Sequence, residues 1–146
     1  MTSDEATALV AATTARWEAS PETDVVWSGT FEGRLGLRMA QRCRDFTTIW
    51  FSIGERTVRF EAYLLPAPPY RQGEAHRWCL ARNWTSWPAS IAADTDGDLH
   101  IIGHVTLEDL TEATLDRAVG AVYDTVERSF RPLLRIGFTR PAPPTG

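Results

Sequence analysis

The residues best suited to bind a cation form one short cluster around a glycine. Asp94, Asp96 and Asp98 surround Gly97 with the oxygen-rich spacing of half a calcium-binding loop. A complete loop of that kind needs a glutamate six residues beyond the glycine, where this chain has Gly103. An Asp-Gly pair between two apolar runs is also a typical β-hairpin turn. The sequence therefore predicts a hairpin turn here and no metal site.

The histidines are the other candidates for metal binding or acid–base chemistry. His100 and His104 share one face of an expected strand, where four residues of rise separate them by about 13 Å. That spacing is too wide for one metal ion. His76 lies near the apolar side of an expected helix, where a hydrogen-bonded structural histidine is more common than a catalytic base. We therefore expect neither a metal ligand nor a catalytic base among them.

Nucleophilic and phosphate-binding chemistry also lacks a recognisable motif. Cys43 and Cys79 are single and widely spaced, as buried free thiols are, and form no zinc or redox pair. All 15 basic residues are arginine, so the lysines of Schiff bases and phosphate loops are missing. Gly29, Gly33 and Gly36 do not have the spacing of a dinucleotide-binding turn. We predict no catalytic residue, no cofactor and no enzymatic activity.

Composition and charge restrict the partners that this chain can bind. A chain of 146 residues with 43% hydrophobic residues is expected to form one domain with a packed core. The net charge of −4 and the lack of a basic run argue against nucleic acid as a partner. Neither a leader sequence nor a membrane-spanning apolar run is visible, so we expect no membrane association and a cytoplasmic protein.

Three helices are needed to position these side chains, and each has its own sequence signal. Thr2 and Glu5 have the spacing of a capping box, which predicts a first helix running to about Ser20. The segment 73–87 predicts a second helix, and 115–130 a third that Pro132 ends. On the second helix one side is expected to carry five residues, with Trp78 on the opposite side. The five are Cys79, Leu80, Asn83, Trp84 and Trp87.

Alternating apolar residues predict five strands, at 34–40, 47–53, 58–64, 90–94 and 99–105. Residues 24–33 are rich in turn formers and predict only a short extended piece. The proline-rich segment 66–69 cannot continue a sheet and predicts a stiff connector. The expected class is α+β, an antiparallel five-stranded sheet with three helices in the order α-β-β-β-α-β-β-α. The single domain 1–146 is expected to have an ordered core at about 5–138 and a flexible proline-rich tail at 139–146.

One face of the predicted sheet carries aromatic and basic side chains together. Trp50 and Tyr63 fall on it with Arg38 and Arg59, beside Arg34, Glu61 and Ile102. Helices usually cover one face of such a sheet, which would leave these aromatics exposed for a protein contact; helices on both faces would bury them instead. The candidate partner-binding surface consists of Trp50, Tyr63, Arg38, Arg59, Trp78 and Trp84.

The segment 48–59 followed by Tyr63 to Pro68 resembles the YbjN family, especially its members from high-GC bacteria. Later stretches that agree in order are Asn83, Asp96 to Leu99, Leu115 to Tyr123 and Leu133 to Phe138. The resemblance covers about residues 5–138. It implies a fold similar to the type III secretion chaperones. It also implies a non-enzymatic, chaperone-like or regulatory domain, often dimeric, that holds a peptide or a partner protein.

Two functions of different classes remain open at this point. The first is a protein-binding domain that forms a homodimer through the second helix and Trp78. It would present Trp50, Tyr63 or Trp84 to a client, by groove burial or by strand addition. The second is a small-molecule module or cryptic enzyme with a pocket between sheet and helices. In that case His76, or the cluster of Arg34, Arg38 and Arg59, would recognise an anion.

Overall fold

A computed structural model describes residues 1–144 of the chain, and residues 145 and 146 of the predicted tail lie outside the described part. Three helices accompany one antiparallel sheet, so the predicted α+β class is confirmed. The elements are α1 (Ser3–Ala19), β1 (Val25–Phe31), β2 (Arg34–Ala40), β3 (Phe46–Ile53), β4 (Thr57–Leu65), α2 (Gln72–Asn83), β5 (Ala89–Ala93), β6 (Leu99–Thr106) and α3 (Glu112–Gly137). In the part of the chain described, no helix is long and apolar enough to cross a membrane.

The sheet has six strands in the order β1-β2-β3-β4-β6-β5, so the predicted five-stranded sheet is wrong by one strand. The added strand is β1, in the segment that predicted only a short extended piece. A two-residue turn at Glu32 and Gly33 joins it to β2, with φ angles of 51° and 80°. Two consecutive positive φ angles twist the chain to match a tight hairpin. Glutamate is an unusual residue at the first of these positions, so the sequence did not predict this hairpin.

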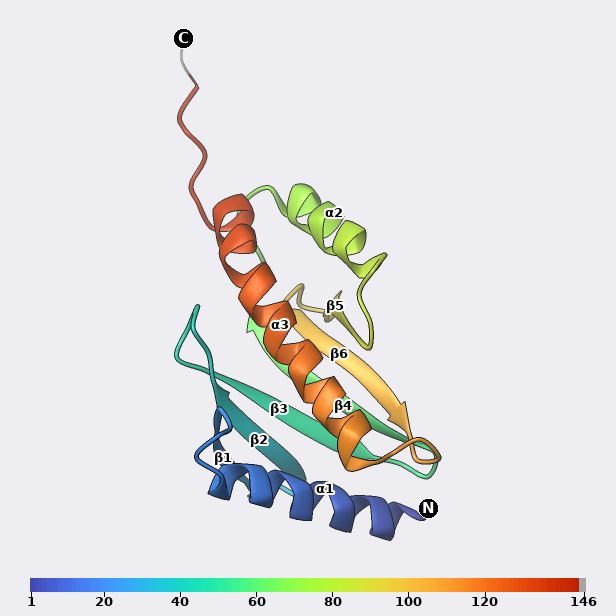
Figure 1. Ribbon diagram of the computed structural model, residues 1–146. Helices are drawn as coiled ribbons and strands as arrows, with labels where there is room; N and C mark the ends of the chain where they lie inside the picture. The colour runs from blue at the N-terminus through green and yellow to red at the C-terminus, as the bar shows by residue number, and fades with distance from the viewer. Residues whose placement is uncertain (145–146) are drawn as a thin grey trace.

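The helices cover one face of this sheet. The face carries buried side chains from the central strands, among them Leu37, Ile49, Phe60 and Ile101, and the buried residues of the helices join the same core. Figure 1 shows α3 running across the sheet, with α1 beside β1 and α2 near β5. Of the two arrangements considered from the sequence, the structure has helices on one face only. The other face keeps its side chains at least partly exposed along most of its length.

The third helix does not end at Pro132, as its sequence predicts, but continues through it to Gly137. A proline inside a helix lacks the N–H that would bond the carbonyl four residues back. Burial explains why the helix continues, because Leu133 and Gly137 lie in the core on the far side of the proline. Gly137 packs against Pro68 of the proline-rich connector, and its carbonyl accepts a hydrogen bond from Tyr70 N at 3.0 Å.

The second helix is shorter than predicted, and three of the five residues predicted to share one side are exposed. It ends at Asn83, and its buried residues are the small Ala75 and Cys79. Leu80, Trp84 and Trp87, expected on the same side as Cys79, are 71%, 90% and 77% exposed. Small side chains allow α2 to pack against α3 and β5. For this reason the small residues are buried, and the larger, more hydrophobic ones are exposed. Trp78, expected on the opposite side, is half-buried against the core.

Candidate functional site

Three aromatic side chains gather on the sheet face that no helix covers. Trp27 and Phe31 of β1 both contact Trp50 of β3, with ring centroids 6.3 Å and 6.2 Å apart. The Trp27–Trp50 pair meets edge to face, a favourable arrangement for aromatic rings. The residues are neighbours because β2 lies between β1 and β3 and places them on the same side. We call this cluster, Trp27, Phe31 and Trp50, the aromatic face.

Two glycines, Gly29 of β1 and Gly36 of β2, make this packing possible. A Cβ atom on Gly36 would lie 2.7 Å from Trp50 and 3.0 Å from Trp27. A Cβ on Gly29 would lie 3.1 Å from Trp27. All three distances are shorter than ordinary carbon contacts, so the indoles rest directly on the backbone of β1 and β2. The glycines therefore explain how both tryptophans pack directly against the sheet.

Arginines surround the aromatic face and stack on it. The guanidinium carbon of Arg34 lies 5.7 Å from the Trp50 ring centroid, and that of Arg38 lies 6.0 Å from the Trp27 ring. Both distances fall within the range of cation–π attraction. Arg38 Nε also donates a hydrogen bond to Thr48 Oγ1 at 3.0 Å. The face thus combines apolar area with oriented donors, a composition enriched at the centre of protein interfaces.

Glu61 neutralises part of the positive charge beside the aromatic face. Its carboxylate pairs with Arg34 at 2.5 Å and with Arg59 at 3.5 Å. Partial burial raises the pKa of Glu61, but the hydrogen bonds and charges of the two arginines outweigh it, and the net shift is downward. Glu61 is therefore ionised at neutral pH. Of the predicted cluster of Arg34, Arg38 and Arg59, two members share Glu61, whereas Arg38 stacks on Trp27.

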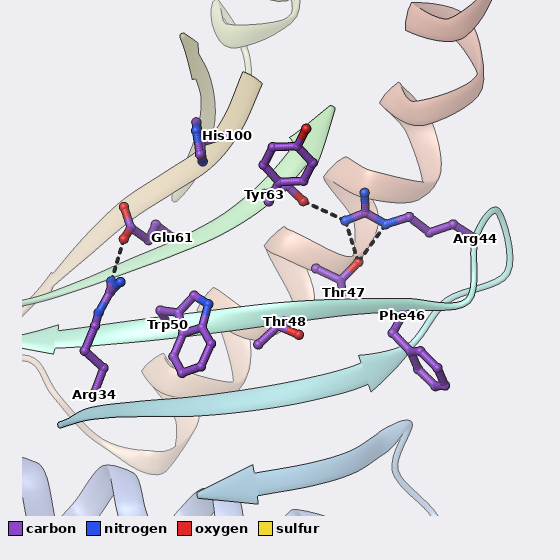
Figure 2. A pocket seen from close by; sticks show the side chains of 9 residues that line it. All are labelled: Arg34, Arg44, Phe46, Thr47, Thr48, Trp50, Glu61, Tyr63 and His100. Carbon is purple, nitrogen blue, oxygen red and sulfur yellow. Dashed lines mark hydrogen bonds and ion pairs between the residues drawn. The ribbon is translucent and has the colours of Figure 1, made fainter. Parts of the chain in front are cut away.

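A shallow hollow of about 410 Å³ continues from the aromatic face toward β6 (Figure 2). Its wall includes Trp50, Phe46 and Tyr63, with polar groups from Glu61 and His100. Tyr63 is 47% exposed, and its ring meets His100 edge to face at 5.6 Å. The hollow is open to solvent and is lined by polar and apolar surface together. Such a hollow is better suited to the side chains of a partner protein than to a small molecule, which usually binds in an enclosed pocket.

Arg44 closes the end of this hollow and has a structural role. Its guanidinium donates to the carbonyls of Leu64 at 2.7 Å and Tyr63 at 2.8 Å, and to Thr47 Oγ1 at 2.9 Å. The pairing of β3 with β4 stops at Ala62, so these carbonyls have no partner strand on that side. Burial lowers the pKa of Arg44. The arginine replaces the missing strand and is not free to bind a ligand.

The aspartate cluster forms the predicted hairpin turn. Asp94 Oδ1 accepts the backbone N–H groups of Asp96 and Asp98 at 2.9 Å and 3.0 Å. Asp94 Oδ2 pairs with His100 Nε2 at 2.8 Å, and β5 and β6 are antiparallel neighbours. Hydrogen bonding to His100 is the largest of the effects that lower the pKa of Asp94. The prediction of a hairpin is confirmed; the Asp94 carboxylate is engaged by the turn itself, and Asp98 Oδ1 accepts from Ala67 N at 2.8 Å.

The thiols and the remaining histidine do not form a reactive site in the described residues. Burial raises the pKa of Cys43 and of Cys79 to about 11, so both remain protonated at neutral pH. His76 lies on α2, and its buried Nε2 has no hydrogen-bond partner among residues 1–144. The expected hydrogen-bonded histidine is therefore not observed at that nitrogen.

The structure brings together four of the six predicted surface residues. Trp50, Arg38, Arg59 and Tyr63 share the uncovered sheet face, whereas Trp78 lies on α2 and Trp84 caps the C-terminal end of that helix. Sequence reasoning missed two members of the cluster, Trp27 and Phe31, because it did not assign β1. The alternation of Trp27, Gly29 and Phe31 before a Glu-Gly turn was the signal that could have identified them.

Comparison with known proteins shows which family model this chain matches. Residues 10–135 match the model of the YbjN family, described as a putative bacterial sensory transduction regulator. An uncharacterised protein of Mycobacterium leprae is 32% identical over 123 residues, 83% of this chain and 67% of that protein. One from Mycobacterium tuberculosis H37Rv is 31% identical over 87 residues, 60% of this chain and 48% of that protein. The chain thus spans between about half and two thirds of these relatives.

A solved structure shares the fold at low sequence identity. A chain of the heterodimeric complex ExoU–SpcU, from the type III secretion system of Pseudomonas aeruginosa, matches with a TM-score of 0.58 and 18% identity. The match covers 85% of this chain and 96% of the other. The chain therefore shares its fold with a protein of a type III secretion complex, in agreement with the fold that the family resemblance implied.

Proposed function

The chain belongs to the YbjN family, and on that premise we propose that it is a non-enzymatic, chaperone-like or regulatory domain that binds a partner protein. The observation that carries this proposal is the aromatic face with its stacked arginines. The structural relative from a heterodimeric complex supports it, because the same fold there belongs to a protein with a protein partner. The partner of this chain is a polypeptide of unknown identity.

The aromatic face has the physical properties of a docking surface. Trp27 and Trp50 are half-buried and Phe31 is 60% exposed, so apolar area faces solvent without a covering helix. Because the rings are already ordered by packing on Gly36 and on one another, binding would cost little side-chain entropy. Arg38, which is exposed and unpaired with any carboxylate among residues 1–144, would supply a polar contact at the rim.

The two sheet edges favour contact with the face over strand addition. At the β5 edge, Asn83 bonds both backbone groups of Ile91, with Nδ2 to O and Oδ1 to N at 2.9 Å each. At the β1 edge, the Ser28 N–H donates to the carboxylate of Glu18. Backbone groups that already have partners are poor templates for another strand. We therefore propose docking on the face.

Affinity capture from native lysate with a tagged protein tests this function. We expect the wild type to retain a specific partner and the double variant Trp27→Ala, Trp50→Ala to lose most of it, because truncation removes the anchoring rings. The matched control is Trp87→Ala, which removes an exposed tryptophan outside the face. Circular dichroism establishes that each variant is folded. Equal recovery of the same partner by both variants would contradict the proposal.

The proposed homodimer would use the exposed side of α2. Leu80 and Trp84 lie there beside Gly73 and Ala81 around an open groove. Trp78 is half-buried against the core, so Trp78→Ala is expected to destabilise the monomer. We expect Leu80→Glu to reduce the mass measured by light scattering from that of a dimer to that of a monomer. A monomeric wild type at high concentration would contradict the homodimer and leave the partner-binding face untouched.

The alternative of a small-molecule site has less support. The space between sheet and helices is filled by buried side chains such as Phe60, Leu64 and Val122. Arg34 and Arg59 already share Glu61, which weakens attraction for an anion. The hollows of the surface are open, and no observation favours a particular small ligand. The protein-binding function is therefore our conclusion.

A further inference from the structure

A cleft of about 330 Å³ lies on the helical side of the molecule, away from the aromatic face. It is formed where the end of α1, the chain leading into β1, the strand β2 and the first half of α3 meet. The chain at this point is held in place, because the Thr23 hydroxyl donates to the Trp17 carbonyl and Ala40 N donates to Asp24 O at 2.8 Å. The cleft is therefore a formed feature of the fold.

The floor of the cleft is apolar. Trp17, Val25, Met39 and Val119 line it, and all but the buried Met39 are half-buried. Gly120 of α3 also lines it, and a Cβ atom built there meets nothing within 4 Å. Apolar surface beside open space is available for burial by another molecule.

The rim of the cleft is acidic. Glu22 and Asp24 come from the chain before β1, and Asp116 and Asp124 come from α3. All four side chains are exposed, and in residues 1–144 none forms a salt bridge or a side-chain hydrogen bond. By contrast, the carboxylates of Glu61, Asp94 and Glu127 elsewhere all have partners.

The acidic field reaches the aromatic wall of the cleft. Burial raises the pKa of Tyr123, and the charges of Glu127 and Asp24 raise it further, with Arg42 opposing them. An apolar floor with a negative rim is complementary to a side chain that is aliphatic along its length and positively charged at its end. Lysine and arginine side chains place an aliphatic stem on apolar surface and keep the cation at its edge.

From this complementarity we infer that the cleft between α1 and α3 binds a basic segment of a partner polypeptide, in which arginine or lysine alternates with apolar residues. The apolar side chains would cover Trp17 and Val119, and the cations would meet the carboxylates of Asp24 and Asp124. This site is separate from the aromatic face. It adds the chemistry of a second contact to the proposed function and is testable whether or not the first contact exists.

A pair of fluorescein-labelled peptides tests the inference on the full chain. Both peptides have leucine at every second position. The remaining positions are arginine in the first peptide and glutamate in the second. We expect the arginine peptide to bind, and its affinity to fall as salt rises because the rim charges are exposed. In ¹⁵N-labelled protein the largest shifts are expected at the amides of Val119, Gly120 and Tyr123.

Two variants identify the groups responsible. Asp24→Asn with Asp124→Asn is expected to weaken binding of the arginine peptide about tenfold, since two exposed ion pairs are lost. Gly120→Leu fills the cleft and should abolish binding while leaving α3 intact. The matched control, Glu32→Gln with Glu55→Gln, removes the same charge at exposed positions outside the cleft and should have no effect.

The contradicting results are equally distinct. Absence of binding by the arginine peptide, equal binding of both peptides, or equal weakening by the control pair would overturn the inference. Shifts confined to β1–β3 amides of the aromatic face would assign the peptide to that surface and also overturn it. If the protein dimerises as its concentration rises, and the dimer no longer binds the arginine peptide, a second copy of the chain fills the cleft instead. That result would also overturn the inference. The variant Trp27→Ala, Trp50→Ala should bind the arginine peptide as the wild type does, because neither ring lines the cleft, and loss of peptide binding in this variant would overturn the inference.

Discussion

At the scale of single residues, Asn83 connects a helix to the edge of the sheet. Its amide donates to and accepts from the backbone of Ile91, as a neighbouring strand would. An asparagine suits this role because its side chain carries both a donor and an acceptor in one plane. The residue therefore both docks α2 on the sheet and blocks an edge that could otherwise pair with another chain.

We predict that Asn83→Ala lowers the free energy of unfolding by about 1–3 kcal/mol, because two hydrogen bonds to one backbone residue are lost. Urea denaturation followed by circular dichroism measures this change. Thr85→Ala, an exposed position two residues away, is the control and should change stability by less than about 0.5 kcal/mol. An equally small effect of Asn83→Ala would show that the amide is not required to hold the edge.

Glu127 holds the loop between β2 and β3 on the third helix. Its carboxylate accepts from Gln41 Nε2 at 2.6 Å and from the backbone N–H groups of Arg42 and Cys43 at 3.0 Å and 3.1 Å. Burial raises the pKa of Glu127, but these hydrogen bonds lower it by more, and the net pKa lies below the ordinary 4.5. Because the folded pKa is depressed, the stabilisation is present above pH 4.5 and is lost as the pH falls through the folded value.

We predict that Glu127→Gln removes this pH dependence. The variant should be less stable than wild type at pH 7 by about 1 kcal/mol, since it loses charge-assisted hydrogen bonds. As the pH falls below 4.5, the difference should shrink, because the wild-type carboxylate also becomes neutral. Thermal unfolding measured from pH 7 to pH 3 checks both points. A constant difference across this range would contradict the assignment.

At the scale of elements, the third helix shows what periodicity can and cannot predict. Its apolar stripe through Leu115, Val122 and Val126 identifies the helix and its buried side correctly. Its end is not visible in the sequence, because local rules place it at Pro132. The helix continues to Gly137 because Leu133 is buried in the core and Gly137 packs against Pro68. The second helix fails for the same reason, since burial of Ala75 and exposure of Trp84 follow from contacts between elements.

We predict that Pro132→Ala stabilises the protein by about 1 kcal/mol or more. Alanine restores the backbone donor and suits a helix interior better than proline does. The half-buried proline ring makes some contacts, which offset part of the gain. Urea denaturation provides the measurement, with Arg131→Ala at the adjacent exposed position as control. Destabilisation of Pro132→Ala alone would mean that the ring's contacts outweigh the missing hydrogen bond.

At the scale of the whole molecule, placing all helices on one side of the sheet creates the candidate site. The sequence predicted which strand residues share a face, so Trp50, Tyr63, Arg38 and Arg59 could be grouped before the fold was known. It could not show that helices leave this face open, because strand alternation does not reveal which layer lies above it. Nor could it place Trp27 beside Trp50, since that contact depends on β1 pairing with β2.

Site-specific photo-crosslinking tests most directly whether the uncovered face binds a partner. Ser52→Cys places a thiol on the exposed side of β3, within two residues of Trp50, for labelling with a benzophenone maleimide. The pKa values of about 11 for Cys43 and Cys79 should keep the native thiols largely unlabelled at neutral pH. Glu108→Cys, exposed beyond the end of β6, is the control. We predict that irradiation in lysate joins a specific polypeptide to the Ser52→Cys protein and that Trp27→Ala abolishes this product. Crosslinking to the same polypeptide from Glu108→Cys alone, or to none from Ser52→Cys, would contradict the proposed binding face.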